Sequence, residues 1–512
     1  MNYDVVIVGA GHNGLVAATF LARAGLSVLV LEQADQAGGA VRTENPFEKA
    51  PRVGQSTGAY LLGLMPPELI EKLGVSIPTI RRDPHYFLPG LDDRYLLLGS
   101  DQDEAKRQFI DFFSEADFHA YQALHEELAA MREDVAPTWL QTPLSIEETS
   151  ERYLRPSLQQ TFVELCRGSV GDYLSRFDFN HDLIPAMYAV TDAFSGSVGG
   201  WETPGSGMNF FVHNMCRLTG AEGTWMVVRG GMGTVTSRLA GAARRAGAQI
   251  RLSSPVVAIE SSQGTVTGVA LEDGSTVSAE IVVSNADPFH TRQLVGRDRL
   301  QRAENEKLDR LFRHGTTLKV NLCLTDLPEF RCLPGRQGQH HGTIHLLPQG
   351  EDVLEAINEA HRQAMSGQLA SFPTIEWYIQ TPVDPSLSDE QGRHSSALFV
   401  QWVPYEIEGS SWEEEAEDYA RHLLSICDRF APGTSDLVED MFILPPPSIE
   451  AHFGITAGHI HHVDNIFGFS DRPPYATSIQ GLYSCSAGCH PAGSVIGAAG
   501  HNAAMKVLSD CE

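Results

Sequence analysis

The stretch YDVVIVGAGHNG at residues 3–14 decides the fold. A short apolar run leads directly into three glycines spaced Gly-x-Gly-x-x-Gly, and a run of helix formers follows them. A second apolar run then ends on Glu32, 18 residues after Gly14. A strand, a glycine turn, a helix, a second strand and an acid, in this order, are typical of a dinucleotide-binding βαβ unit.

Each residue type in this unit meets a separate physical demand. Gly9 allows a tight turn, Gly11 lets the backbone approach a pyrophosphate, and Gly14 lets the helix lie close to the strand. The free N–H groups at the start of the helix attract phosphate. The acid at position 32 suits a free ribose 2′-hydroxyl, as in FAD or NAD, rather than the 2′-phosphate of NADP.

Length and charge limit the classes of function. At 512 residues, two or three structural domains are expected, and 42% hydrophobic and 20% charged residues are typical of a soluble globular protein. The net charge of −28 argues against a nucleic-acid partner, because no basic excess is present to neutralise phosphates. The same charge disfavours strong electrostatic attachment to an anionic membrane.

The cysteines and the apolar runs indicate the compartment. Eight cysteines are scattered along the chain without a CxxC pair, so neither a disulfide framework nor a zinc knuckle is predicted. No signal peptide is recognised ahead of the first strand, and no apolar run approaches the ~20 residues of a membrane span. We therefore expect a cytoplasmic protein that is at most peripheral to a membrane.

Further glycine-rich turns recur at wide intervals along the chain. GGAVRT at 38–43 follows the strand that ends on the acid, and RGGMGT at 229–234 leads into a predicted helix. A turn signal at Asp273-Gly274 joins two strand-like runs into a hairpin. Near the end, a strand at 481–485, the small-residue turn AGCHPAGS at 487–494 and a helix close the pattern. Nucleotide-binding signatures thus lie at both ends and in the middle.

These blocks resemble the phytoene desaturase-type flavoproteins, within the amine-oxidase-like FAD enzymes. The match rests on 8–14 with Glu32, on 38–43, on 229–234 and on 487–494, in an order and at approximate spacings that span nearly the whole chain. Within the family, the chain is most similar to the branch that holds a bacterial carotenoid ketolase and relatives described as pyridine nucleotide-disulfide oxidoreductase-domain proteins.

The resemblance implies FAD, held non-covalently in an extended pose. It places the first glycine turn at the pyrophosphate, Glu32 at the adenosine ribose, and the backbone of Val257 at the adenine. The turn at 38–43 would run along the flavin side, and the turn before the last helix would approach the isoalloxazine and ribityl end. The cofactor-binding residues implied in this way are Gly9, Ala10, Gly11, Asn13, Gly14, Glu32, Gly38, Gly39, Arg42, Val257, Gly488, Gly493, Ser494 and Val495.

The resemblance also implies the architecture. The fold class is α/β, with a discontinuous Rossmann-like FAD-binding domain, an inserted mixed-sheet substrate domain and a helical lid subdomain. The FAD-binding domain comprises 1–75, 225–298 and 450–512. The substrate domain comprises 76–102 and 299–449, and the helical subdomain comprises 103–224.

Two departures separate the chain from the family pattern. Ala492 follows Pro491 where the family has a glycine, a small change that keeps flavin binding. The stretch 465–474 is shorter than the corresponding segment of close relatives, which carries a His-Gly and an Asp-Gln before the Arg-Pro. The resemblance to the family therefore does not extend to a carotenoid substrate for this chain.

Histidines near the expected flavin have competing interpretations. His490 is the one catalytic candidate, as a proton relay, although it could simply shape the turn before Pro491, and Cys489 could form a thioether to the flavin. The histidines at 340–345 and 459–462 are candidate metal ligands, but no matched acids or cysteines complete a ligand set. Strand-surface histidines are the default there, and no metal is predicted.

Two helical segments have structural interpretations. The aromatic-rich helix at 104–134 could be a lid that touches a membrane or an apolar substrate, but its acidic polar face favours ordinary core packing. The acids at 413–418 are expected to start a solvated helix, where they suit the helix dipole.

The resulting functional hypothesis is an FAD-dependent oxidoreductase that takes a hydride from an apolar, partly unsaturated small molecule. Desaturation is the preferred reaction type, and ketolation or amine oxidation is ranked after it. A flavin-dependent isomerase without net redox turnover is the alternative from another class. A disulfide reductase is disfavoured because no CxxC accompanies the nucleotide motifs. No second Gly-x-Gly-x-x-Gly is present for a nicotinamide, so oxygen or a quinone is the expected electron acceptor; the oligomeric state is left open.

Overall fold

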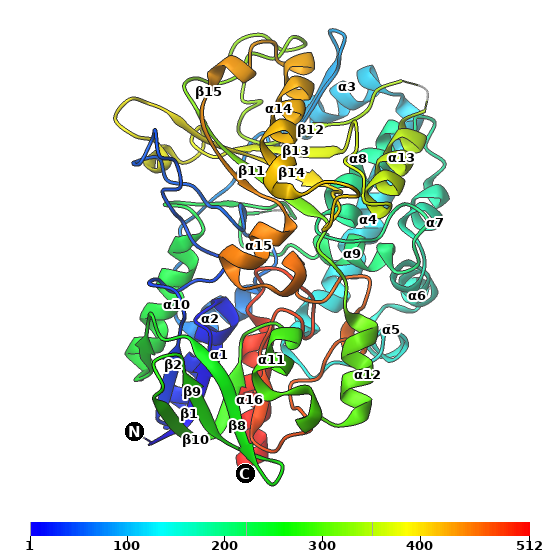
Figure 1. The fold of residues 1–512 in the computed structure, drawn as a ribbon. Helices are drawn as coiled ribbons and strands as arrows, with labels where there is room; N and C mark the ends of the chain where they lie inside the picture. Colours follow the sequence, from blue (N-terminus) through cyan, green and yellow to red (C-terminus); the bar gives the residue numbers. More distant parts are fainter. Residues whose placement is uncertain (1, 222, 351) are drawn as a thin grey trace.

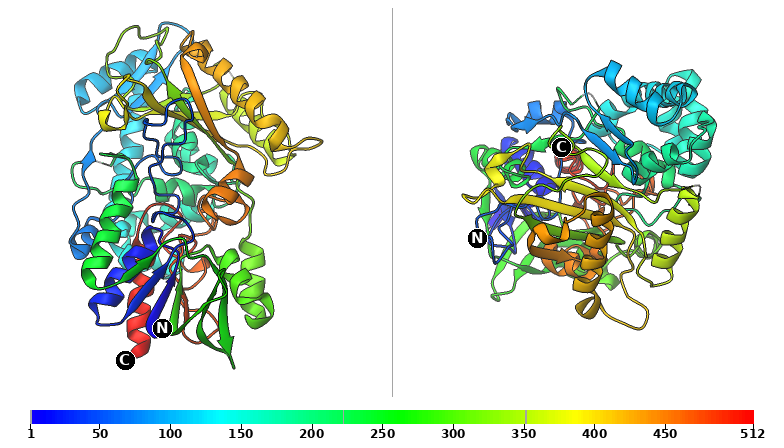
Figure 2. Two further views of the ribbon diagram at one scale, coloured as in Figure 1. Left: turned by 60° about the vertical axis from the view of Figure 1, so that its left-hand side comes forward. Right: turned by 90° about the horizontal axis from the view of Figure 1, so that it is seen from above.

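The computed structural model describes residues 2–221, 223–350 and 352–512. Figure 1 shows two sheets, one above the other, with both chain termini beside the lower sheet. Helices of residues 102–213 stand along one side. Seen from above, these helices lie on the opposite side of the upper sheet from the long helix α14 (Trp412–Phe430) (Figure 2). The predicted α/β class with mixed sheets is confirmed, and the domain bounds stay a prediction.

The lower sheet gathers strands from the beginning, middle and end of the chain. Its order is β7-β2-β1-β10-β9-β8, with β16 paired to β10. The pairs β7–β2, β2–β1, β1–β10 and β10–β16 are parallel, whereas β8, β9 and β10 pair antiparallel. The strands are β1 (Asn2–Val8), β2 (Val28–Leu31), β7 (Gln249–Arg251), β8 (Val256–Ser262), β9 (Thr265–Leu271), β10 (Thr276–Ser284) and β16 (Leu482–Ser484).

The predicted βαβ unit and hairpin are confirmed in this sheet. Residues 5–8 and 28–31 are buried on both faces, which explains why they read as continuous apolar runs. The helix α1 (His12–Arg23) between them packs against α10 (Gly233–Ala246) and α16 (Ala498–Cys511). The approach to α16 is close, because a Cβ on Gly500 would lie 2.1 Å from the Asn13 carbonyl oxygen.

The upper sheet separates an apolar face from a polar one. Its order is β15-β11-β14-β13-β12-β4-β5, antiparallel except for the β12–β4 pair. Alternate side chains, such as Leu318 and Val320, pack against α14, and those between them point to the opposite face. The strands are β4 (Tyr86–Pro89), β5 (Tyr95–Leu98), β11 (Thr317–Leu324), β12 (Thr343–Leu346), β13 (Thr374–Ile379), β14 (His394–Gln401) and β15 (Val438–Leu444).

The aromatic-rich segment forms two helices instead of the predicted one. Helix α3 (Gln102–Phe112) ends before Ser114, whose hydroxyl accepts the N–H of Asp117 and so caps α4 (Glu115–Val135). The expected core packing is confirmed, since buried residues of both helices, Phe109 among them, join one apolar cluster. The prediction did not foresee that another side of α4 lines a cavity.

Shorter elements complete the fold. The segment 196–208 is rich in Gly, Ser and Pro and leads into α9 (Ser206–His213). Acids do occupy the first turn of α14, as predicted. Within the described ranges, no helix combines the length and apolarity that crossing a bilayer requires. The other elements are α2 (Pro67–Leu73), β3 (Thr79–Ile80), α5 (Ile146–Tyr153), α6 (Gln159–Arg167), α7 (Val170–Leu174), α8 (Leu183–Tyr188), a π-helical turn (Ala189–Phe194), β6 (Val227–Val228), α11 (Pro288–Val295), α12 (Arg302–Leu311), α13 (Val353–Met365) and α15 (Pro446–Phe453).

Arg472 ties the shortened segment 465–474 to the last glycine-rich turn. The residue is 1% exposed, and its guanidinium donates to six backbone carbonyls and to Asn465 Oδ1, at 2.8–3.2 Å. The carbonyls of Ala487, Gly488 and Cys489 are among the acceptors. One buried cation therefore satisfies a loop that has almost no regular backbone pairing of its own.

We predict that Arg472→Met destabilises the protein by at least about 3 kcal/mol, because buried carbonyls lose their donors. Thermal unfolding followed by circular dichroism measures the change. Arg421→Met is the matched control, since its exposed ion pair with Glu417 contributes little. Equal midpoints for the two variants would show that Arg472 does not hold this region together.

Candidate active site

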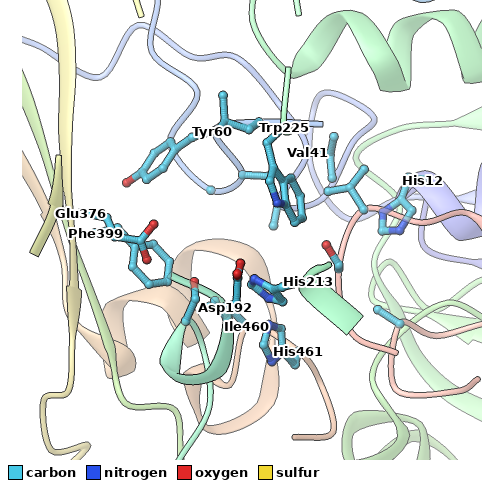
Figure 3. Close-up of a pocket in the computed structure, with 18 of the residues that line it drawn as sticks. His12, Val41, Tyr60, Asp192, His213, Trp225, Glu376, Phe399, Ile460 and His461 are labelled. Carbon is cyan, nitrogen blue, oxygen red and sulfur yellow. The ribbon is translucent and has the colours of Figure 1, made fainter. Parts of the chain in front are cut away.

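A cavity of about 760 Å³ runs from the carboxyl end of β1 to the polar face of the upper sheet. Glycine turns line one end, and aromatic and titratable side chains line the other. Figure 3 shows His12 and Val41 at the glycine end, and Tyr60, Phe399 and Glu376 across from them. The volume of the cavity lies within the range of small-molecule sites, and its wall joins segments that are far apart in the sequence.

Two glycine turns contact each other at the first end. The Gly38 N–H donates to the Ala10 carbonyl at 3.0 Å, and Gly9, Gly38 and Gly39 have φ values of +92°, +142° and +58°. These left-handed conformations explain why glycine is required at those positions. A Cβ on Gly11 would lie only 2.5 Å from Asn285 Nδ2. The backbone therefore forms a cradle without side chains.

Glu32 lies at the wall of this cradle. Its Oε2 accepts the Ala10 N–H at 2.7 Å and its Oε1 accepts the Ala34 N–H at 3.0 Å. The residue is 6% exposed. Because a carboxylate has about four acceptor positions and two are used, acceptor capacity remains for a hydroxyl placed in the cavity.

Two residues of this end were missed by the sequence analysis. Asn285, directly after β10, accepts the Gly14 N–H at 3.1 Å with its Oδ1. His12 lines the cavity, and its buried Nε2 has no hydrogen-bond partner among the described residues. Burial lowers the pKa of His12 to about 4, so its imidazole is neutral. The only sequence signal for His12 was its place inside the glycine motif.

The other predicted cofactor residues divide into two groups. Gly9, Gly11, Asn13, Glu32, Gly38, Gly39, Ser494 and Val495 line the cavity. Gly14, Gly488 and Gly493 lie outside the wall, where a Cβ would collide with the Gly9 oxygen, with Pro288 and with His461. Their glycines allow close packing. Ala10 donates its N–H to Glu32 and is also absent from the wall.

Arg42 and Val257 also depart from the predicted contacts. The Arg42 guanidinium points to Glu44 and His452, at 3.1 and 2.8 Å, and not into the cavity. Val256 is in the wall, whereas Val257 is 51% exposed because successive strand residues face opposite ways. A β-bulge between residues 256 and 258 takes Val257 out of the β8–β9 register. The contact of the Val257 backbone with the adenine stays a prediction.

His490, the catalytic candidate from the sequence, does not line this cavity. It is buried outside the wall, its ring lies 5.5 Å from that of Phe469, and its Nδ1 has no partner among the described residues. The Cys489 thiol is likewise buried away from the cavity, beside the Ser484 hydroxyl. The catalytic role of His490 stays a prediction, and its burial outside the wall shows that sequence proximity to a glycine turn does not fix the direction of a side chain.

The histidines at 459–462 are not on a strand surface. They belong to a buried turn, in which His459 contacts the Asp464 carboxylate at 3.1 Å and His462 contacts the Ser486 hydroxyl at 2.9 Å. His461 lines the cavity beside His213, with 6.3 Å between ring centroids. Across the part of the chain that the structure describes, no group of three His, Cys, Asp or Glu side chains could hold a metal ion.

At the second end, one row of side chains crosses the polar face of the upper sheet. In the strand register Lys319 pairs with Phe399, Phe399 with Glu376, and Glu376 with His345. All four residues line the cavity. The Lys319 Nζ lies 4.3 Å from the centroid of the Tyr60 ring and 4.4 Å from that of Phe399. This contact between a lysine and two aromatic rings was invisible in the sequence.

Three groups at this end have pKa values displaced toward neutrality. Burial lowers the pKa of the Lys319 ammonium to about 7 and raises the pKa of the Glu376 carboxyl to about 8. Burial also raises the pKa of Asp192 to about 7, although a hydrogen bond from the Asn214 amide at 3.1 Å acts to lower this pKa. Perturbed pKa values gathered in one cavity are typical of sites that exchange protons.

The comparisons with known proteins identify the family. The family model described as "Flavin containing amine oxidoreductase" matches residues 14–340. The chain is 32% identical to "Pyridine nucleotide-disulfide oxidoreductase domain-containing protein 2" of Mus musculus, over 99% of this chain and 94% of that protein. This chain belongs to the flavin-containing amine oxidoreductase family, and its cofactor is FAD.

More distant relatives and solved structures agree. The chain is 24% identical to a limonene dehydrogenase polypeptide of Castellaniella defragrans, over 99% of this chain and 94% of that protein. Phytoene desaturase of Rhodobacter capsulatus is 26% identical over 52% of this chain and 50% of that protein. Putrescine oxidase with putrescine bound is similar in fold, with a TM-score of 0.62, 18% identity and coverage of 100% and 99%. The predicted resemblance is confirmed for the family.

The residues at the glycine end fit FAD. The N-cap residue of α1, Gly11, has no side-chain cap, so N–H groups of the first turn remain for a phosphate. The unpartnered His12 Nε2 and the spare acceptor position on Glu32 supply polar contacts beside it. Positive φ values at Gly9 and Gly39 and the approach of Asn285 to Gly11 require glycine at these positions, so backbone lines this end of the cavity.

We predict that Glu32→Ala weakens FAD binding at least tenfold, or ~1.4 kcal/mol, because the ribose loses an acceptor and the Ala10 turn loses its anchor. Quenching of flavin fluorescence during titration of the apoprotein measures the dissociation constant. Glu260→Ala, on the exposed face of the same sheet, should leave it unchanged. Equal affinity for both variants would remove Glu32 from the cofactor site.

Proposed function

We propose that this protein is an FAD-dependent dehydrogenase that removes a hydride from a carbon atom of a small, partly unsaturated molecule. The accompanying proton would pass to its own side chains. The observation that carries the proposal is the row Lys319–Phe399–Glu376–His345. It brings groups with near-neutral pKa values to the wall of the same cavity that begins at the glycine turns.

Bound FAD supplies a two-electron acceptor for a hydride from an activated C–H bond. We expect the N–H groups at the start of α1 to meet its pyrophosphate and Glu32 its ribose. The turn at 38–41, together with Ser494 and Val495, would form the wall beside it. Asn285 would hold the α1 turn in place through its hydrogen bond to the Gly14 N–H.

Lys319 is the proposed proton acceptor. At pH 7 about half of the Lys319 side chains carry a neutral amine, because the pKa of this group lies near 7. The residue is 4% exposed, and the Tyr60 and Phe399 rings fix the position of Nζ. Glu376, whose carboxyl accepts the Tyr378 hydroxyl, lies two strands away and raises the pKa of Lys319.

The cavity wall favours an unsaturated carbon skeleton. Tyr86, Tyr121, Tyr188 and Trp225 present aromatic surface there. Two distant relatives are named for limonene and phytoene, which supports dehydrogenation of carbon–carbon bonds. Amine oxidation and isomerisation without net redox change are less well supported, because arginines in the same wall would repel an ammonium group. Oxygen or a quinone would accept the electrons afterwards.

The decisive test is anaerobic mixing of the FAD-loaded protein with unsaturated alcohols, unsaturated carboxylic acids, terpenes and amines. We expect the flavin absorbance near 450 nm, about the usual maximum of oxidised flavin, to bleach with an unsaturated compound and to return when oxygen or a quinone is added. Bleaching by amines alone would replace the proposal with amine oxidation. Isomerised product without bleaching would replace it with isomerisation.

We predict that the rate of flavin reduction rises with pH through the region of 7, because only the neutral Lys319 amine accepts a proton. Lys319→Met should lower this rate by about 10²-fold, the usual contribution of a positioned base. Lys506→Met, on the surface of α16, is the matched control. An unchanged rate in Lys319→Met would assign the proton to another group.

We further predict that Glu376→Gln moves the midpoint of the pH–rate profile to lower pH. The Glu376 carboxylate raises the pKa of Lys319, so removing its charge lowers that pKa and frees the amine at lower pH. Stopped-flow measurements from pH 5.5 to 9, taken as about two units around the Lys319 titration, resolve the shift. A midpoint that moves to higher pH would contradict this electrostatic coupling.

A further inference from the structure

We propose that the cavity binds a carboxylate of its substrate through Arg82, Arg132 and the Tyr86 hydroxyl. This inference rests on the proposed function and specifies its substrate as a carboxylic acid with an apolar, partly unsaturated body. The three donors come from the segment before β4, from α4 and from β4 itself, and all line the cavity beside its aromatic wall.

Arg82 presents part of its guanidinium to the cavity. The residue is 5% exposed; its Nε donates to the Trp225 carbonyl at 3.0 Å and its Nη1 to the Thr343 hydroxyl at 2.6 Å. These two bonds orient the planar group. Within the described ranges its Nη2 has no hydrogen-bond partner and no carboxylate lies within ion-pair distance, so this buried cation interacts with Glu376 only at longer range.

Arg132 reaches the same short segment, 223–225, that Arg82 contacts. Its Nε donates to the Asn214 carbonyl at 2.6 Å, and its Nη1 lies 2.9 Å from the position that a Cβ on Gly223 would occupy. Gly223 and Trp225 are two residues apart, which keeps the two guanidinium groups within reach of one small ligand. As with Arg82, no ion pair to a described carboxylate is found for Arg132.

Tyr86 supplies a third donor. Its ring stacks on His345 with 4.4 Å between centroids, and its buried hydroxyl has no partner among the described residues. In the strand register Tyr86 pairs with Thr343, the residue that accepts from Arg82. An unpaired hydroxyl therefore neighbours an unpaired guanidinium edge.

The other charged groups of the wall leave this end cationic. Lys319 adds positive charge when it is protonated, and Glu126 is an exposed residue of α4. Burial raises the pKa values of Asp192 and Glu376 to about 7 and about 8, so each carries only part of a full negative charge at neutral pH, whereas both arginines stay charged. The nearby histidines, His85, His125, His213 and His345, are neutral because burial lowers each pKa.

A carboxylate fits these donors better than a phosphate or an ammonium group. Planar guanidinium groups bind the two oxygens of a carboxylate with parallel hydrogen bonds. A phosphate dianion would be repelled by Asp192 and Glu376 whenever either is ionised, and an ammonium group has no acceptor to spare on the arginines. The aromatic wall at 86, 121, 188 and 225 would hold the apolar body.

The test is isothermal titration calorimetry of the FAD-loaded protein with octanoate, 1-octanol and octylamine. We expect octanoate to bind at least tenfold more tightly than 1-octanol and octylamine to bind most weakly. A wild-type protein that shows no preference for octanoate over 1-octanol overturns the proposal. This comparison needs no variant and so does not depend on how a substituted protein folds.

Variants locate the effect. Arg82→Met and Arg132→Met should each weaken octanoate binding at least tenfold and leave 1-octanol binding unchanged, and Arg82→Lys should restore part of the affinity. Arg107→Met, which removes an exposed arginine of α3, is the matched control. Undiminished octanoate affinity in both Met variants would exclude this site.

The two proposals fail in different ways. Octanoate binding that depends on Arg82, with no flavin reduction by any unsaturated acid, would overturn the dehydrogenase function and leave the carboxylate site standing. Flavin reduction by unsaturated hydrocarbons or alcohols, without an octanoate preference, would overturn the carboxylate site alone.

Discussion

The parallel pairing of β1 with β10 is the contact on which the rest of the site depends. In its register Val8 lies opposite Ser284, so the first glycine turn and Asn285 leave the sheet side by side. Asn285 then fixes the start of α1 through the Gly14 N–H. On the other edge of β10, β16 delivers the small-residue turn that contributes Ser494 and Val495 to the cavity. Three distant segments thereby share one cofactor end.

The upper sheet places titratable groups in the wall of a buried cavity. Strand alternation sends its aliphatic side chains to α14 and leaves Lys319, Phe399, Glu376 and His345 in one row on the opposite face. Burial brings the pKa values of the lysine and the glutamate together near neutrality. The same low-dielectric environment that makes these groups costly to bury makes them able to exchange protons at physiological pH.

Local charge in the cavity opposes the charge of the whole molecule. The chain carries a net charge of −28, yet Arg82 and Arg132 line the cavity and have no ion-pair partner within the described ranges. An acidic surface would not attract an anion from solution, so its binding would rest on short-range hydrogen bonds inside the cavity. Composition describes the surface of this protein and says nothing about the interior site.

The sequence by itself determined the cofactor end. Glycine spacing, apolar runs and an acid at position 32 report local backbone geometry, which neighbouring residues dictate, and these features predicted the βαβ unit, the hairpin and a dinucleotide with a free ribose 2′-hydroxyl. The resemblance of the glycine-rich blocks to a flavoprotein family then implied FAD. Only the tertiary structure decided which side chains face the cavity. His490 follows a glycine turn but is buried elsewhere, whereas Lys319, Glu376 and Arg82 meet through strand pairing and loop packing. Those contacts join residues from tens to more than two hundred positions apart, and no local pattern encodes such long-range registers.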